Sequence, residues 1–291
     1  MTQIVLQHYE KPAARRHLWV GLLMAVVGAV FGIEQAMQWL AAHPMAAHGL
    51  EASLLAGAAT GLGAIPVLML RRPSERLMAP MLGLAGGMML AASLFSLLAP
   101  AVQMVVASPA PWTLGVATAV ALLAGAGAMQ TLDRRLPHAH VENVDTNAVL
   151  PNVSLVVAAI SIHNIPEGLA VGVAAAAGAD HGMSLGIALQ NIPEGWIVAS
   201  AMITLGAAPV RAALIALATG LVEPLGGLFG VVASSVAGAA LPLALSVAAG
   251  AMLWVVSHEM IPASHRPGRI GAGTAGLVAG FAVMTALASV Y

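Results

Sequence analysis

Nine apolar runs, each about as long as a membrane-spanning helix, follow one another along this 291-residue sequence. A transmembrane helix needs about 20 predominantly apolar residues, whereas a barrel strand needs only about 10. The length of the runs therefore predicts an all-α integral membrane protein built as a helical bundle. The runs cover residues 18–41, 49–70, 77–100, 112–132, 152–177, 182–205, 210–236, 240–262 and 268–290.

The composition agrees with a single membrane domain over residues 1–291. Hydrophobic residues make up 59% of the chain and charged residues only 8%, against about 25% charged residues in soluble domains. A soluble protein this apolar could not cover its surface, so we expect the lipid bilayer to surround it. The net charge of −1 gives no reason to expect nucleic acid as a partner, and the lack of Cys excludes thiolate metal sites.

The basic residues predict the orientation in the membrane. When the nine runs are threaded back and forth, every Lys and Arg falls on the side of the N-terminus. Basic residues collect in cytoplasmic loops, so we expect a multi-pass protein of the bacterial inner membrane with its N-terminus in the cytoplasm and its C-terminus outside. The residues concerned are Lys11, Arg15, Arg16, Arg71, Arg72, Arg76, Arg134, Arg135, Arg211, Arg266 and Arg269.

A polar hexapeptide interrupts the fifth run and recurs in the sixth. His-Asn-Ile-Pro-Glu-Gly occupies residues 163–168, and Gln-Asn-Ile-Pro-Glu-Gly occupies residues 190–195. An ionisable side chain at bilayer depth costs about 2.5–3.5 kcal/mol, so it indicates a functional site. His163 and Glu167 are one helical turn apart and share a face. Pro166 lacks an N–H group, so we expect a kink there and a freed carbonyl near Ile162.

Four polar or sulfur-containing residues are predicted to reach the same depth. Met89, His163, Glu194 and Glu223 each lie eleven to thirteen residues into their runs, which at about 1.5 Å per residue places them near the midplane of the bilayer. The fifth and sixth runs are antiparallel, so their matching hexapeptides form an inverted repeat. Inverted repeats with broken helices around a midplane site are typical of secondary transporters.

The chemistry of these residues favours a divalent metal ion. The carboxylates of Glu167, Glu194 and Glu223 would repel one another in a medium of low dielectric constant, and no Lys or Arg lies at bilayer depth to neutralise them, since Arg211 and Arg269 stand at the ends of their runs. Protons or metal cations must do so. One imidazole with several carboxylate and amide oxygens favours a first-row ion such as Zn²⁺. The Met89 thioether is either a further ligand or a core gap-filler.

Two other classes of function compete with metal transport. A membrane-embedded metalloenzyme would often carry His-Glu-x-x-His, but the one His-Glu pair, His258-Glu259, has no His three residues later. A proton-coupled carrier of an organic solute would more naturally show an intramembrane basic residue or an aromatic pocket, and aromatic residues are only 4% of the chain. We therefore expect a transporter and no enzyme.

The paired hexapeptides resemble the core motif of the ZIP (zinc-regulated, iron-regulated transporter-like) family, in its bacterial form. The resemblance extends to Met81–Ser93, to Glu223-Pro224-Leu225-Gly226 and to 257–262. It implies an eight-helix core over residues 49–290, an extra N-terminal helix over 18–41, and an often dimeric protein that allows a homodimer here. It also implies that a transport bundle slides against a scaffold bundle and carries Zn²⁺, with Cd²⁺, Mn²⁺ or Fe²⁺ tolerated, into the cytoplasm.

The resemblance also implies two adjoining metal sites for the transported substrate, hence one or two Zn²⁺ ions. The first corresponds to Met89, His163, Glu167, Gln190, Glu194 and Glu223, and the second to Asn164, Glu167, Asn191, Glu194 and Glu223. Many family members carry an acidic residue where this chain has Asn191. Two ions would leave three carboxylates with a net charge of +1, so we expect one tightly bound ion and a weak or empty second site.

Two groups of residues on the cytoplasmic side are predicted to help release the ion. The loop 133–148 contains His138, His140 and Glu142, which either hold a metal transiently, as the resemblance implies, or belong to an ordinary solvated loop. His258 and Glu259 lie at the cytoplasmic end of the eighth run and are predicted exit-side ligands.

Overall fold

The structure is a computed structural model. It describes residues 24, 31–32, 34–35, 37–69, 75–135, 149–176, 178, 180–236 and 240–290. These residues form helices and short connections without a strand, so the all-α fold class is confirmed. The chain divides into two compact units, Met1–Ala47 and His48–Tyr291.

Little of the first unit is described. Residues 37–42 are helical, and Trp39 stacks on His43 with ring centroids 4.4 Å apart. Most of the expected N-terminal helix over 18–41 lies outside the described residues, so that helix stays a prediction.

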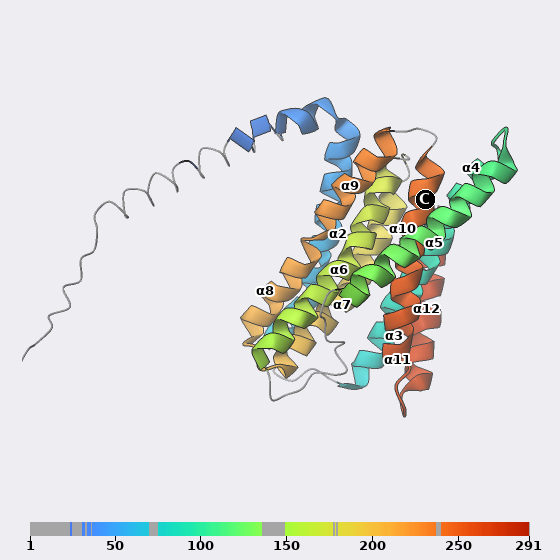
Figure 1. Cartoon of the computed structure of the whole chain (residues 1–291). Helices are drawn as coiled ribbons and strands as arrows, with labels where there is room; N and C mark the ends of the chain where they lie inside the picture. The colour runs from blue at the N-terminus through green and yellow to red at the C-terminus, as the bar shows by residue number, and fades with distance from the viewer. Residues whose placement is uncertain are drawn as a thin grey trace, which may run out of the picture. The chain divides into compact units, whose positions relative to one another are not determined.

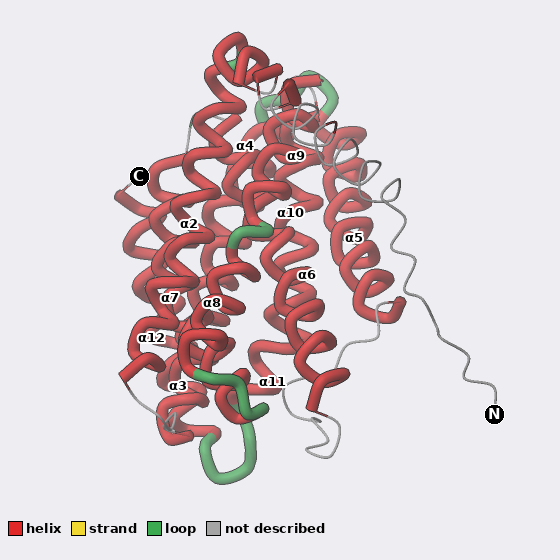
Figure 2. The backbone as a smooth tube through the Cα atoms, turned by 90° about the vertical axis from the view of Figure 1, so that its left-hand side faces the viewer, coloured by secondary structure: helices red, strands yellow, loops and turns green. Residues whose placement is uncertain are grey.

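The second unit is a bundle of helices packed lengthwise against one another (Figures 1 and 2). Its elements are α2 (Pro44–Met69, which begins in the first unit), α3 (Glu75–Ala91), η1 (Ala92–Leu98), α4 (Ala99–Val106), α5 (Pro111–Arg135), α6 (Val149–Ala176), α7 (Asp180–Thr204), α8 (Pro209–Gly220), α9 (Glu223–Val236), α10 (Leu241–Val255), η3 (Val256–Met260), α11 (Ile261–Ser264) and α12 (Ile270–Val290). A helix or a chain of helices therefore stands where the sequence predicts each of the eight core spans.

Six helices are long and apolar enough to cross a membrane: Pro44–Met69, Arg76–Val106, Pro111–Arg135, Pro209–Ser234, Leu241–Ser264 and Ile270–Val290. The helices α6 and α7, which carry the hexapeptides, are not among these six, although they have 28 and 25 residues. A multi-pass membrane protein is thus confirmed, whereas the count of nine spans stays a prediction.

Two spans contain a π-helical segment instead of running as uniform α-helices. A proline, Pro100 or Pro262, follows closely after each segment and cannot donate a backbone hydrogen bond. The residue before each proline donates to the carbonyl five residues back, as in a π-helix. These pairs are Ala99 with Leu94 and Ile261 with Val256.

The seventh expected span is broken in its middle. Leu221 and Val222 form a turn between α8 and α9, so that α9 begins at Glu223. An acidic residue is stabilised at a helix N-terminus because the backbone N–H groups there carry partial positive charge. The break therefore gives Glu223 a favourable place at the start of a half-helix.

Close backbone contacts at glycines divide the helices of the second unit into two sets. The first helix set is α2, α6, α7, α8 and α9; the second helix set is α3, η1, α4, α5, α10, η3, α11 and α12. In the first set, a Cβ atom at Gly168 would overlap the Glu223 carbonyl. In the second set, a Cβ atom at Gly83 would overlap the Gly273 carbonyl. Each set is thus packed backbone against backbone, as small residues allow in membrane helices.

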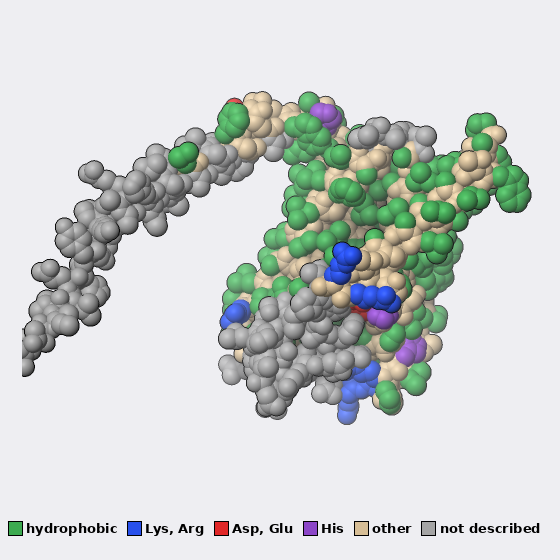
Figure 3. Space-filling view, viewed as in Figure 1, with side chains coloured by type: hydrophobic (Ala, Val, Ile, Leu, Met, Phe, Trp, Pro, Cys, Tyr) green, Lys and Arg blue, Asp and Glu red, His purple; other side chains and the backbone are tan. Residues whose placement is uncertain are grey.

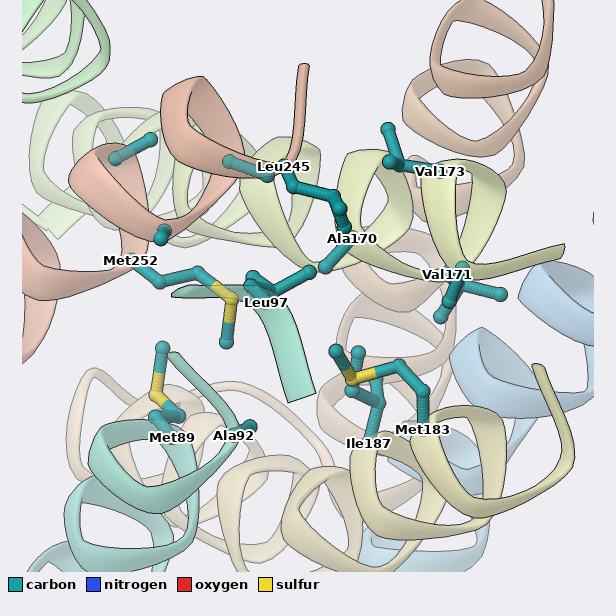
Figure 4. Close-up of a cluster of buried hydrophobic side chains, with 14 of the residues drawn as sticks. Met89, Ala92, Leu97, Ala170, Val171, Val173, Met183, Ile187, Leu245 and Met252 are labelled. Atoms are coloured by element: carbon teal, nitrogen blue, oxygen red, sulfur yellow. The ribbon is translucent and has the colours of Figure 1, made fainter. Parts of the chain in front are cut away.

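The two helix sets meet through side chains. Among the glycines that the structure describes in this unit, Gly186 alone would overlap a residue of the other set if it carried a Cβ atom, and it faces the flexible thioether of Met284. Figure 4 shows the cluster between the sets, where Met183 and Ile187 of α7 lie across from Met89 and Leu97.

The outer surface of the bundle is strongly apolar. Hydrophobic side chains are spread over the described part of the face shown in Figure 3. The side chains of Trp112, Leu123 and Phe229 are 88%, 68% and 68% exposed. Apolar exposure on this scale indicates contact with lipid hydrocarbon rather than with water.

Candidate metal site

Most polar residues of both hexapeptides lie in the interior of the first helix set, while His163 and Glu194 are half-buried. Asn164, Glu167, Gln190, Asn191 and Glu223 are buried, each no more than 1% exposed. They come from α6, α7 and the first residue of α9. Residues of both hexapeptides and Glu223 are thus buried in one helix set, and their role as metal ligands stays a prediction.

Each Pro-Glu-Gly motif ends in a glycine that a close backbone contact requires. A Cβ atom at Gly168 would overlap the carbonyl oxygen of Glu223 on α9, and one at Gly195 would overlap the carbonyl oxygen of Thr60 on α2. The close approach at Gly168 brings the start of α9 directly beside the turn that carries Glu167. The glycines thus determine how near the carboxylates come to one another.

A side-chain hydrogen bond joins the two hexapeptides. The Nε2 atom of Gln190 donates to Oε1 of Glu167 at 2.8 Å. A hydrogen bond to a carboxylate is about twice as strong as one between neutral groups. The bond fixes the Glu167 carboxylate against α7 and leaves its second oxygen, Oε2, without a hydrogen-bond partner among the described residues.

Asn191, the next residue along α7, makes a similar side-chain hydrogen bond to a glutamate of α9. The Nδ2 atom of Asn191 donates to Oε1 of Glu223 at 2.6 Å and to the backbone carbonyl of Ala56 at 2.8 Å. Consecutive residues point in directions about 100° apart around a helix, so Gln190 and Asn191 reach two different helices. One amide thus binds each of two buried carboxylates.

Several buried polar atoms of this cluster have no hydrogen-bond partner in the described part of the chain. They are Asn164 Oδ1 and Nδ2, Glu167 Oε2, Gln190 Oε1, Asn191 Oδ1 and Glu223 Oε2. A buried polar atom without a partner costs about 1–3 kcal/mol, and native proteins rarely keep several together. Five of the six atoms are oxygens, which are the ligand atoms a cation needs.

The cluster is acidic and has no basic counter-charge on its own helices. Glu167 interacts electrostatically with Glu194 and Glu223, while α2, α6, α7 and α9 contain no Lys or Arg. No group of three or more His, Asp or Glu side chains within the described residues is arranged to hold a metal ion as it stands. A complete ligand set therefore needs the amide oxygens, or a turn of the side chains, or both.

His163 is paired with a glutamate that lies outside the hexapeptides. Its Nε2 atom lies 2.7 Å from Oε1 of Glu259 in η3, with the two side chains 14% and 16% exposed. The contact crosses from the first helix set to the second. The predicted ligand of the metal site is thus paired with a predicted exit-side residue, which the sequence did not indicate.

Comparison with known proteins identifies the family. The protein-family model described as ZIP zinc transporter matches residues 134–288. The zinc transporter GufA of Myxococcus xanthus is 44% identical over 251 residues, which are 82% of this chain and 97% of that protein. The chain belongs to the ZIP zinc transporter family.

Other ZIP relatives match at similar length. The zinc transporter ZIPB of Bordetella bronchiseptica is 45% identical over 249 residues, covering 78% of this chain and 76% of that protein. The zinc transporter ZupT of Escherichia coli is 33% identical over 249 residues, covering 80% and 92%. The protein is therefore a transporter and not an enzyme, as the sequence predicts.

Met89 of this ZIP protein belongs to an apolar part of the interior. It is 2% exposed and belongs to the hydrophobic cluster between the helix sets, where Figure 4 shows its thioether directed toward Met252. In this structure Met89 packs as a core residue. Its role as a ligand stays a prediction of the family resemblance.

A second ionisable cluster lies where the end of α5 meets η3. The Nε2 atom of His258 lies 3.6 Å from Oδ2 of Asp133, and the His258 ring stacks on Trp254. From the sequence, Asp133 appeared only as the first residue of a loop, with no role in the site. The signal that could have indicated a role is that Asp133 and the pair His258-Glu259 are both predicted at the cytoplasmic ends of their spans. His138, His140 and Glu142 lie outside the described residues.

Proposed function

We propose that this ZIP protein carries Zn²⁺ across the bacterial inner membrane into the cytoplasm, through the buried cluster of α6, α7 and α9. The observation that carries the proposal is the group of buried, unpartnered oxygens on Glu167, Gln190, Asn191 and Glu223. A divalent cation would satisfy these atoms and neutralise the carboxylates at the same time. The relatives GufA, ZIPB and ZupT are named zinc transporters.

The ligand chemistry supports zinc over magnesium or calcium. Carboxylate and amide oxygens alone would suit magnesium, calcium or manganese, whereas imidazole suits zinc, iron, copper and nickel. His163 supplies an imidazole that interacts electrostatically with Glu194. A mixed oxygen and imidazole set favours Zn²⁺ and tolerates Cd²⁺, Mn²⁺ or Fe²⁺.

Transport proceeds by a movement of the first helix set relative to the second. Backbone contacts at glycines hold each set together, while the cluster between them consists of side chains such as Met89, Met183 and Met284. Unbranched thioether side chains repack readily. The metal site belongs to the first set, so a sliding first set would carry the ion with it and expose it to each side in turn.

His163 and Glu259 hand the ion to the cytoplasmic side. In this proposal His163 turns from the buried oxygens to Glu259, and the contact of His163 with Glu259, next to the pair of His258 and Asp133, supports that path. The one-sided basic residues support a cytoplasmic location for that cluster, since Arg134 and Arg135 follow Asp133 directly. A homodimer stays a prediction of the family resemblance.

Zinc accumulation in bacterial cells tests the proposal. Cells that express the unmodified chain should accumulate zinc faster than cells with an empty vector, and Glu167→Gln should remove most of the gain. The matched control is Glu51→Gln, the same change at an exposed position of α2, which should keep it. Equal accumulation in all four cultures, with equal amounts of protein in the membrane, would refute the proposed function.

A further inference from the structure

We infer that the side-chain amide of Asn191 occupies the place of a second cation beside Glu223, so that this carrier holds a single Zn²⁺ ion. The inference rests on the proposed function and concerns the number of ions that the same site binds. It starts from the contacts of one side chain, which is fully buried between α2, α7 and α9.

The orientation of the Asn191 amide is fixed by its neighbours. A side-chain amide has two N–H hydrogens and one carbonyl oxygen, and the nitrogen must face groups that accept. The backbone carbonyl of Ala56 only accepts, and it lies 2.8 Å from Nδ2. A flipped amide would place its oxygen against that carbonyl and against the Glu223 carboxylate, so the nitrogen must point to both.

Both hydrogens of the Asn191 amide are therefore in use. One is donated to Ala56 and the other to Oε1 of Glu223, at 2.6 Å. They bring partial positive charge to the side of the Glu223 carboxylate where a second cation would otherwise bind. A second ion there would first have to displace the amide from two acceptors inside the protein.

The other oxygen of Glu223 stays available for the transported ion. Oε2 of Glu223 has no hydrogen-bond partner among the described residues, and the same holds for Oε2 of Glu167, whose Oε1 accepts from Gln190. The two amides thus occupy one oxygen of each carboxylate and leave one oxygen of each for a metal. This arrangement suits one shared ion better than two.

The two asparagines of the hexapeptides differ in this respect. Asn164 is as deeply buried as Asn191, yet neither Oδ1 nor Nδ2 of Asn164 has a partner in the described part of the chain. The repeated sequence gives no reason for such a difference. The difference arises because Asn191 faces a carbonyl, which can only accept, and a carboxylate. The amide of Asn191 therefore donates hydrogen bonds to both groups without a metal ion.

Replacing Asn191 with Asp tests this directly. An aspartate would put an oxygen against the Ala56 carbonyl and add a negative charge beside Glu223, and a cation between them would relieve both repulsions. Purified full-length protein is equilibrated with rising free Zn²⁺, and bound zinc is counted by elemental analysis. We expect one ion per unmodified chain and two per Asn191→Asp chain, and a larger zinc-dependent rise in melting temperature for the variant.

The possible counts separate the inference from the proposed function. Two comparably tight ions in the unmodified protein would overturn the inference and leave zinc transport standing. No bound zinc in the unmodified protein would refute both. If Asn191→Asp does not fold without metal, it is purified in zinc and counted after dialysis, and one ion in the variant would also overturn the inference. The count on the unmodified chain decides even if no variant can be purified.

Discussion

The Nε2 atom of His163 lies 2.7 Å from Oε1 of Glu259, and this contact joins a helix of the first set to the π-helical turn of the second. The turn exists because Pro262 interrupts the regular backbone bonds of its helix. π-Helical turns occur frequently at functional sites. The pairing gives the imidazole of His163 a partner outside the hexapeptides.

We expect Glu259→Gln to slow zinc uptake about tenfold, which corresponds to about 1.4 kcal/mol on a barrier. The variant keeps the shape of the side chain but loses the charge that attracts His163 and the ion on its way out. Zinc affinity should stay equal or rise, because His163 is then freer to turn toward the buried oxygens. Initial uptake rates in proteoliposomes and calorimetric titration measure the two quantities.

Unchanged uptake in Glu259→Gln would contradict the role given to this pair. Glu51→Gln is the control, since it removes a carboxylate from an exposed position. A parallel loss of binding and uptake in Glu259→Gln would instead make Glu259 a ligand of the buried site.

Gly168→Ala should destabilise the protein by about 1–3 kcal/mol, the usual cost of overpacking. The added methyl group would overlap the backbone carbonyl of Glu223, which cannot move as a side chain can. Gly127→Ala is the matched control, because nothing lies within 4 Å of a Cβ atom there. Thermal unfolding in detergent should separate the two variants, and equal melting temperatures would contradict the close packing of α6 on α9.

Zinc binding should weaken as the pH falls. Carboxylate ligands must be ionised and imidazole must be neutral to bind a metal, so protons compete with zinc for Glu167, Glu223 and His163. Calorimetry in buffers of different ionisation enthalpy should therefore detect proton release on zinc binding. Heats that do not depend on the buffer would argue against ionisable ligands.

The orientation of the chain is testable because the sequence contains no Cys. A cysteine introduced at Ala47 should react with a membrane-impermeant maleimide on intact cells, and one introduced at Ser74 should react only after the cells are opened. This pattern follows from the one-sided distribution of basic residues. If Ser74→Cys reacts on intact cells and Ala47→Cys does not, the predicted topology is wrong.

The helical class and the positions of the eight core helices could be predicted from the sequence, because the length of an apolar run determines what can cross a bilayer. The hydrogen bonds within the cluster could not. Gln190 and Asn191 are neighbours in the sequence, and which helix each one reaches depends on how closely α2, α6 and α9 approach α7. That approach is set by glycines such as Gly168 and Gly195, whose contacts appear only in three dimensions.

The irregular backbone was also beyond the sequence prediction. Hydropathy averages over a whole span, so a two-residue turn at Leu221 and Val222 leaves no mark on it. The kink expected at Pro166 stays a prediction, and both α6 and α7 continue as helices through Pro166 and Pro193. The break lies instead just before Glu223-Pro224.

Zinc flux into proteoliposomes tests most directly whether the buried cluster is the path of the ion. Purified protein is reconstituted into liposomes that contain a zinc indicator, and zinc is added outside. Liposomes without protein measure the rate at which zinc leaks in. The unmodified protein should fill the vesicles well above the leak rate, while Glu167→Ala and His163→Ala, reconstituted in equal amounts, should fall to or near it. Equal flux through the unmodified protein and both variants would contradict transport through this site.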